Sequence, residues 1–226
     1  MSAQRASLAA AAAAASAFAL LATLVVTGEL TGVDQYAVDH WMPEVEPGAS
    51  SSSALGSIQL YPKPGSALHA FSNFWTYPAS PICSTLLLLA GCLLLYRRGR
   101  RSAAFAWPVV WVAANAVELL GKSALGRPPL HLGPAPLHGF DSSFPSGHTV
   151  RAVLLTVVLA SLWRRAAPAA LGWLVVALLV LVVNADHTPT DVGGGVLLAL
   201  TATFAVRGFA ARSAPVRLAY AAAPSR

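Results

Sequence analysis

Long apolar segments alternate with short polar ones along most of this chain. A helix needs roughly 17–25 mainly apolar residues to cross a bilayer core about 30 Å thick. Six segments approach this length and predict transmembrane helices at residues 7–27, 74–96, 103–120, 146–163, 166–184 and 191–209. We therefore expect an all-α, polytopic membrane protein with six transmembrane helices, in which Pro78 and Pro81 weaken the start of the second span.

The composition points to the same class of protein. Hydrophobic residues make up 56% of the 226 residues and charged residues only 11%, and the mean hydropathy is +0.61. An ordinary soluble domain has about 25% charged residues, and a disordered chain is rich in charge and poor in apolar residues. The composition therefore argues against both of these classes.

The distribution of charge predicts how the chain is oriented. The formal net charge of +6, taken alone, suggests a nucleic-acid or acidic-membrane binder. In the six-helix arrangement, however, one side of the membrane holds eleven of the fifteen basic residues and no acidic residue. The other side holds all nine acidic residues and all six histidines. By the positive-inside rule, both termini lie in the cytoplasm of a multi-pass cell-membrane protein, and nucleic acid is not an expected partner.

The spans divide the chain into three parts. Residues 1–73 comprise the first transmembrane helix and a long extracytoplasmic loop, for which the sequence predicts no chemistry. Residues 74–209 form the helical core, and residues 210–226 form a cytoplasmic basic tail.

Polar residues of the core gather at three predicted helix ends, all on the extracytoplasmic side. Ionisable groups at membrane depth are costly and usually have a function. The first group follows the third span, the second opens the fourth span, and the third joins the fifth span to the sixth. The candidate residues are Lys122 and Arg127 in the first group, Ser146, Gly147, His148 and Arg151 in the second, and His187 and Asp191 in the third.

These residue types suit phosphoryl transfer. A helix that begins at a glycine offers backbone N–H groups and a favourable dipole to an anion. His148 and His187 are able to act as acid and nucleophile near neutral pH. Asp191, four residues after His187, is placed to orient that imidazole if the stretch is helical. The carboxylates are too few and too scattered for a dedicated magnesium site, so we expect no metal and no cofactor.

The three groups resemble the motifs of the type 2 phosphatidic acid phosphatase (lipid phosphate phosphatase) superfamily. Its motifs are, in order, Lys-x6-Arg-Pro, Pro-Ser-Gly-His and Ser-Arg-x5-His-x3-Asp. Here Pro145-Ser146-Gly147-His148 matches the second motif in full, and His187-x3-Asp191 matches the end of the third. Lys122 followed by Gly126-Arg127-Pro128 looks like the first.

The chain departs from this pattern at two arginines. Pro129 and Leu130 stand where the family has Arg-Pro, so that Arg127 comes two residues early. Val180 and Leu181 stand where the family has Ser-Arg. Arg151 lies three residues after His148, on the same face of the predicted helix. Our hypothesis is that Arg151 supplies the missing guanidinium.

The resemblance implies a fold, a reaction and a set of roles. The fold is that of the six-helix membrane branch, with the active site at the extracytoplasmic ends of the third, fourth and sixth helices. The reaction is metal-independent hydrolysis of a lipid phosphate or polyprenyl diphosphate through a phospho-histidine. By position, the nucleophile is His187, its orienting carboxylate is Asp191 and the general acid is His148. The phosphate ligands are Lys122, Arg127, Ser146, Gly147 and Arg151.

Two alternatives stay open. A degenerate relative that binds or transports phospholipid without catalysis is favoured by the missing arginine. The two histidines and Asp191 argue against it, because a binder needs neither a nucleophile nor an acid. A phosphotransferase would use the same site with a lipid or sugar acceptor. The sequence predicts neither the substrate nor the oligomeric state.

Overall fold

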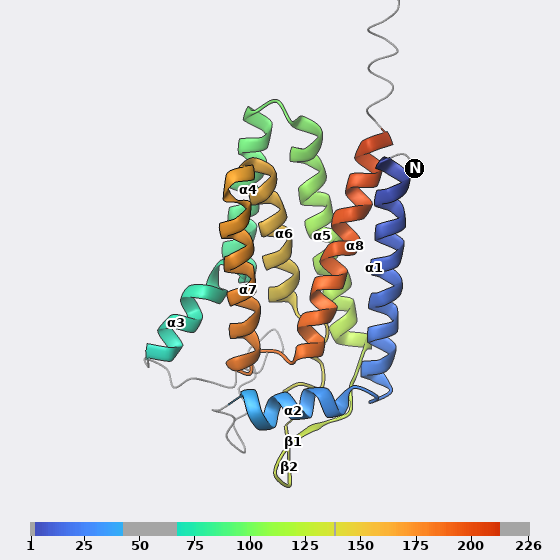
Figure 1. The fold of residues 1–226 in the computed structure, drawn as a ribbon, viewed down its shortest axis with the longest axis vertical. Coiled ribbons are helices and arrows are strands. Elements are labelled where there is room, and N and C mark those ends of the chain that lie inside the picture. Colours follow the sequence, from blue (N-terminus) through green and yellow to red (C-terminus); the bar gives the residue numbers. More distant parts are fainter. Residues whose placement is uncertain (1–2, 43–66, 138, 213–226) are drawn as a thin grey trace, which may run out of the picture.

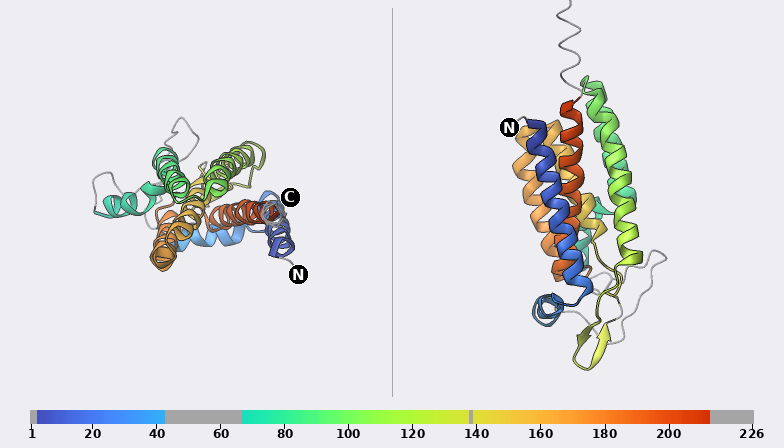
Figure 2. Two further views of the ribbon diagram at one scale, coloured as in Figure 1. Left: turned by 90° about the horizontal axis from the view of Figure 1, so that it is seen from above. Right: turned by 90° about the vertical axis from the view of Figure 1, so that its right-hand side faces the viewer.

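The computed structural model describes residues 3–42, 67–137 and 139–212, and most of them are helical (Figure 1). The long helices run side by side along the longest axis of the molecule (Figures 1 and 2). They are α1 (Ala3–Val26), α4 (Pro81–Arg97), α5 (Arg101–Ala124), α6 (Gly147–Leu162), α7 (Ala167–Val183) and α8 (Pro189–Arg212). The chain is therefore an all-α, multi-pass membrane protein, as the apolar pattern predicts.

Shorter elements lie at the ends of this bundle. They are α2 (Thr31–Trp41), α3 (Ala67–Thr76), and the 3-10 turns η1 (Tyr77–Ala79) and η2 (Arg164–Ala166). The strands β1 (Leu130–Leu132) and β2 (Ala135–Leu137) form a small antiparallel hairpin, with Leu130 opposite Leu137. This hairpin between α5 and α6 is an addition to the predicted all-α fold.

Among the described residues, four helical segments are long and apolar enough to cross a membrane: α1, α5, η2 with α7, and α8. The segments α3 and α4 together qualify as a fifth span only as a pair bent by 50°. The remaining predicted span, α6, is apolar but has only 16 residues. The six-span count therefore stays a prediction, although five of the predicted spans each correspond to one helix of the bundle and α4 covers most of the second, 74–96.

The second span differs from the continuous helix expected at 74–96. Pro78 lies in the 3-10 turn η1, and Pro81 is the first residue of α4. Between them, Ser80 has an extended backbone with φ −62° and ψ 153°, as the residue before a proline prefers. The two prolines therefore end one helix and start another, and α3 leaves the bundle sideways (Figure 1).

Both ends of the described chain lie at the same end of the bundle, because α1 packs along α8 (Figures 1 and 2). Gly208 of α8 makes this close approach possible, since a Cβ there would lie 2.6 Å from Leu8 Cδ2. The arginine-bearing turns between α4 and α5 and between α6 and α7 lie at this same end. The opposite end carries α2, the β-hairpin and the α7–α8 connection (Figure 1).

Helix α6 occupies the centre of the bundle and contacts α4, α5, α7 and α8. Its first turn is fixed against α8 by glycines in the sequence Gly193-Gly194-Gly195. A Cβ at Gly195 would lie 2.6 Å from the backbone oxygen of Ser146, and one at Gly194 would lie 2.5 Å from the Phe144 ring. The absence of these side chains sets the distance between the beginnings of α6 and α8.

We predict that Gly195→Ala destabilises the protein by about 1–3 kcal/mol, because the added methyl group overlaps the Ser146 carbonyl. Gly172→Ala is the matched control: Gly172 lies in α7 and has no neighbour within 4 Å of its Cβ position. Thermal unfolding in detergent measures the difference. The control is expected to be neutral or slightly stabilising, since Ala favours helix more than Gly does. Equal unfolding temperatures for the two variants would contradict the packing argument.

Candidate active site

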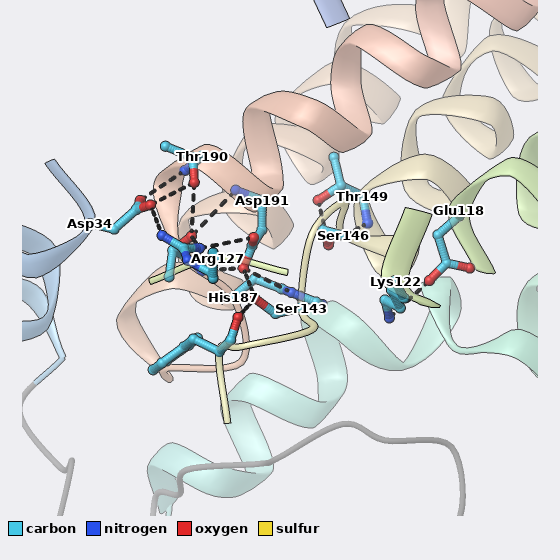
Figure 3. A network of polar contacts seen from close by, with 12 residues as sticks. Asp34, Glu118, Lys122, Arg127, Ser143, Ser146, Thr149, His187, Thr190 and Asp191 are labelled. Carbon is cyan, nitrogen blue, oxygen red and sulfur yellow. Dashed lines mark hydrogen bonds and ion pairs between the residues drawn. The ribbon is translucent and has the colours of Figure 1, made fainter. Parts of the chain in front are cut away.

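The candidate residues from all three motif groups gather at the end of the bundle opposite the termini (Figures 1 and 3). They come from the end of α5, the segment that follows it, the beginning of α6, the α7–α8 connection and the first turn of α8. Figure 3 shows two neighbouring clusters of polar side chains, one around Arg127 and Asp191 and the other around Glu118 and Lys122.

The two histidines face the same region from different helices. His148 lies in the first turn of α6, and His187 lies just before α8. Their ring centroids are 6.2 Å apart, with an angle of 56° between the ring planes. The turn after α7 holds His187 in place, because the N–H groups of Asp186 and His187 both donate to the Leu181 carbonyl. This spacing lets both imidazoles reach one small substrate group.

Asp191 lies beside His187 in the first turn of α8, as the four-residue spacing predicts. Its Oδ2 is 3.6 Å from His187 Nδ1, slightly beyond a normal hydrogen bond. The same oxygen accepts hydrogen bonds from Ser143 Oγ at 2.6 Å and from the Thr188 N–H at 3.0 Å. The carboxylate is fully buried, so these donors and the helix N-terminus stabilise its charge.

Ser146 is the N-cap of α6. Its Oγ accepts hydrogen bonds from Thr149 N at 3.2 Å and from Thr149 Oγ1 at 3.0 Å. This leaves the Ser146 hydroxyl proton for another acceptor. The Ser146 N–H donates to the Asp191 carbonyl at 3.0 Å, so a backbone hydrogen bond joins the second motif to the third.

Lys122 and Glu118 border the first turn of α6. Lys122 Nζ lies 2.8 Å from Glu118 Oε1, and its side chain keeps 23% exposure while Glu118 is buried. A Cβ at Gly147 would lie 2.5 Å from Glu118 Oε1, so only glycine fits between α6 and this carboxylate. Lys122 is thus a partly accessible cation beside the beginning of α6, where backbone N–H groups have no acceptor within the helix.

Arg151 lies inside the bundle rather than toward lipid, next to the same carboxylate. Its Nη1 is 3.9 Å from Glu118 Oε2 and donates to Asn115 Oδ1 at 3.0 Å. Its Nε donates to the Ala79 carbonyl at 2.8 Å. Arg151 therefore links α6 to α5 and to the turn before α4. Two of its guanidinium nitrogens, Nε and Nη1, already donate to protein oxygens.

The position of Arg127 differs from that expected of a phosphate ligand. Its guanidinium is only 2% exposed and forms ion pairs with Asp34 Oδ2 and with Asp191 Oδ1, the latter at 3.2 Å. It also donates to Thr188 Oγ1 at 2.9 Å. Arg127 comes two residues before the family position, in the extended segment after α5, and from there it contacts the carboxylates instead of the α6 N-terminus.

Asp34 is the residue that the sequence analysis missed. The loop after the first span, for which the sequence predicts no chemistry, contributes this one side chain to the polar network around Arg127. Asp34 is fully buried in α2, where its Oδ1 accepts from Thr190 N at 3.1 Å and its Oδ2 from Thr190 Oγ1 at 2.6 Å. Ala37 and Val38 are buried on the same face of α2. The sequence did contain a signal for this burial: Asp34 stands three and four residues before the apolar Ala37 and Val38, and therefore on the same face of a helix.

Within the described residues, no group of three or more His, Cys, Asp or Glu side chains is spaced to hold a metal ion. The positive charge of the site comes from Lys122, Arg127 and Arg151 and from helix N-termini.

Asp186 adds a titratable group next to His187, in the connection between α7 and α8. Burial raises the pKa of Asp186 from 3.8 to about 7. The folded state therefore loses stability as pH rises from about 4 to about 7, because the charged carboxylate is better solvated in the unfolded chain. We predict that Asp186→Asn raises the unfolding temperature by a few degrees at pH 8 and has little effect at pH 4.

Thermal unfolding of the purified protein at the two pH values tests this prediction. Asp39→Asn, at an exposed position of α2, is the control and is expected to show no pH-dependent gain. The same shift in both variants, or no shift at Asp186, would mean that burial does not penalise the Asp186 charge.

The chain is similar to known proteins in its motif region and in its fold. Residues 118–214 match the model of the PAP2 superfamily, a range that contains all three motif groups and excludes Asp34. The fold is similar to that of a solved transmembrane PAP2-type phosphatidylglycerolphosphate phosphatase from Bacillus subtilis, with a TM-score of 0.63. The sequences are 19% identical over 91% of this chain and 98% of that one. A comparison with curated proteins gave no match.

Proposed function

We propose that this chain is a member of the PAP2 superfamily, whose model matches residues 118–214, and that it is an integral membrane phosphatase that hydrolyses a lipid phosphate or polyprenyl diphosphate. The observation that carries the proposal is the pair of imidazoles, His148 and His187, 6.2 Å apart, with the buried Asp191 beside one of them. A site for phosphoryl transfer through a covalent intermediate needs a nucleophile, an acid and an orienting carboxylate, and these three residues supply them.

In the first step, Nε2 of neutral His187 attacks phosphorus, and the bond from phosphorus to the leaving oxygen breaks. His148 gives its proton to that oxygen, so that the leaving group departs as an alcohol or a protonated phosphate. The product is a phospho-histidine at His187. Asp191, next to Nδ1 of the same ring, stabilises the positive charge that develops there.

In the second step, His148 removes a proton from water, and the water oxygen attacks phosphorus. The bond from phosphorus to His187 Nε2 breaks, which releases inorganic phosphate and restores neutral His187 and protonated His148. Lys122, the Ser146 hydroxyl and the backbone at Gly147 bind the phosphoryl oxygens in both steps. Arg151 lies behind Glu118, with its Nη1 3.9 Å from Glu118 Oε2, and adds positive charge near the beginning of α6.

The membrane setting narrows the substrate class. The candidate site lies at the end of the bundle opposite the arginine-bearing turns, which by the positive-inside rule is the extracytoplasmic end. A substrate with its phosphate in the headgroup layer and its chain in the bilayer suits this location. Phosphatidate, phosphatidylglycerol phosphate and polyprenyl diphosphate all have this form, and the structural neighbour is described as a phosphatidylglycerolphosphate phosphatase.

We predict that the purified protein releases inorganic phosphate from at least one of these three lipids, and that His187→Ala abolishes the release. The loss follows because the proposed mechanism forms its covalent intermediate at His187. His131→Ala, an exposed histidine in the β-hairpin at the same end of the molecule, is the matched control and keeps wild-type activity.

The products separate the proposal from its alternatives. Transfer of phosphate to a lipid or sugar acceptor, instead of to water, identifies a phosphotransferase. Full activity of the His187→Ala variant would refute the nucleophile assignment. Lipid binding without phosphate release from any of the three substrates would identify a non-catalytic relative.

We also predict that activity persists in excess EDTA and that vanadate inhibits it. Cationic side chains and backbone dipoles supply the charge stabilisation in the proposed mechanism, and vanadate imitates the phosphoryl group at the same ligands. Phosphate release with and without each reagent is the measurement. Activity that disappears in EDTA and returns with added Mg²⁺ would show that the mechanism is incomplete.

A further inference from the structure

We infer that Asp34 of α2 is a positioning residue for the proposed reaction: through Arg127 it holds Asp191 beside the nucleophile His187. The inference rests on the proposed function and extends its machinery to a helix outside the segment that matches the family model.

Arg127 connects two carboxylates that come from different helices. Its Nη2 bonds to Asp34 Oδ2, and its Nη1 bonds to Asp191 Oδ1 at 3.2 Å. Because Arg127 occupies Oδ1 of Asp191, the other oxygen of that carboxylate, Oδ2, is directed toward Nδ1 of His187, 3.6 Å away. Ser143 Oγ and the Thr188 N–H hold Oδ2 from one side, and the Arg127 guanidinium holds Oδ1 from the other, so that Arg127 helps to set which carboxylate oxygen the nucleophile meets (Figure 3).

Asp34 fixes the guanidinium from the other side. All three residues are buried, and a buried charge is stable only when it is paired and hydrogen-bonded. With Asp34 in place, Arg127 has a carboxylate at each end. Without the Asp34 charge, the guanidinium would be drawn toward Asp191 alone, and Asp191 would move away from His187.

Asp34 also holds the beginning of α8, where Asp191 lies. It accepts hydrogen bonds from both the backbone N–H and the hydroxyl of Thr190, at 3.1 Å and 2.6 Å. The backbone N–H belongs to the first turn of α8 and has no acceptor within that helix. A carboxylate at this position also interacts favourably with the helix dipole.

The docking of α2 does not depend on Asp34 alone, so a variant at this position is expected to fold. Gln35 Nε2 donates to the His131 carbonyl at 2.7 Å, and Gln35 Oε1 accepts from the His131 N–H at 2.9 Å. Ala37, Val38 and Met42 belong to a buried apolar cluster with Leu130 of the hairpin.

The test compares Asp34→Asn with Asp39→Asn, which removes an exposed carboxylate from the same helix. We expect Asp34→Asn to lower kcat by roughly 10- to 100-fold, because a small displacement of a group that orients the nucleophile has an effect of this size. KM should change less than about twofold, and Asp39→Asn should behave as wild type. Asp34→Glu, which keeps the charge, should recover part of the lost kcat.

A double-mutant cycle shows whether Asp34 acts through Arg127. If it does, Asp34→Asn causes little further loss of kcat in an Arg127→Gln background, since the connecting group is already absent. If the kcat of the double variant falls by the product of the two single losses, the inference is overturned. A wild-type kcat for Asp34→Asn would also overturn it. The same holds if Asp34→Asn and Asp34→Glu lose activity equally and both unfold at a lower temperature than wild type.

The outcomes for the two proposals are distinct. Phosphate release by wild type, together with unchanged release by Asp34→Asn, overturns the role of Asp34 and leaves the proposed function standing. If neither wild type nor His187→Ala releases phosphate, the proposed function is overturned, and the role of Asp34 is overturned with it.

Discussion

The site depends on the contact between the first turns of α6 and α8. The Ser146 N–H donates to the Asp191 carbonyl at 3.0 Å, and Gly195 allows the two helices to approach this closely because a Cβ there would overlap the Ser146 carbonyl. His148 follows Ser146 in the chain, and His187 precedes Asp191. This backbone hydrogen bond between the two helices therefore helps to set the separation of the two imidazoles, 6.2 Å between ring centroids, with Asp191 beside His187.

Much of the fold was predictable from the sequence, because a bilayer imposes a length on every apolar helix. Five of the six predicted spans each correspond to one helix in the structure, and the second, 74–96, is divided between α3, η1 and α4. The bend before α4 was not predicted, although Pro78 and Pro81 were noted. A proline near the beginning of an apolar segment fits two structures: a helix that starts at the proline, or a span that is broken there. Only the direction of α3, bent by 50° from α4, shows that the second applies.

The site was predictable only where its residues are close in sequence. The spacing of His187 and Asp191 placed them together, and the cap at Ser146 was readable from its position before a glycine. The pairing of Arg127 with Asp34 joins residues 93 positions apart, and no local pattern reports such a contact. The family motif predicted a phosphate ligand at Arg127, but this arginine comes two residues before the motif position. Its guanidinium pairs with Asp34 and Asp191 instead, and the motif does not report those distant partners.

The two helix N-termini of the site have different polar partners, and in the proposed mechanism this difference compensates for the altered arginines. The beginning of α8 is occupied by carboxylates of the protein itself, since Thr190 N donates to Asp34 and Thr188 N donates to Asp191. Arg127 lies between these two acids and balances them. The beginning of α6 faces Lys122, which balances the Glu118 carboxylate beside Gly147, and the N-cap hydroxyl of Ser146 accepts only from Thr149 among the described residues. In the proposed mechanism, the dipole of α8 therefore supports the group that orients the nucleophile, and that of α6, with Lys122, is left for the substrate phosphate.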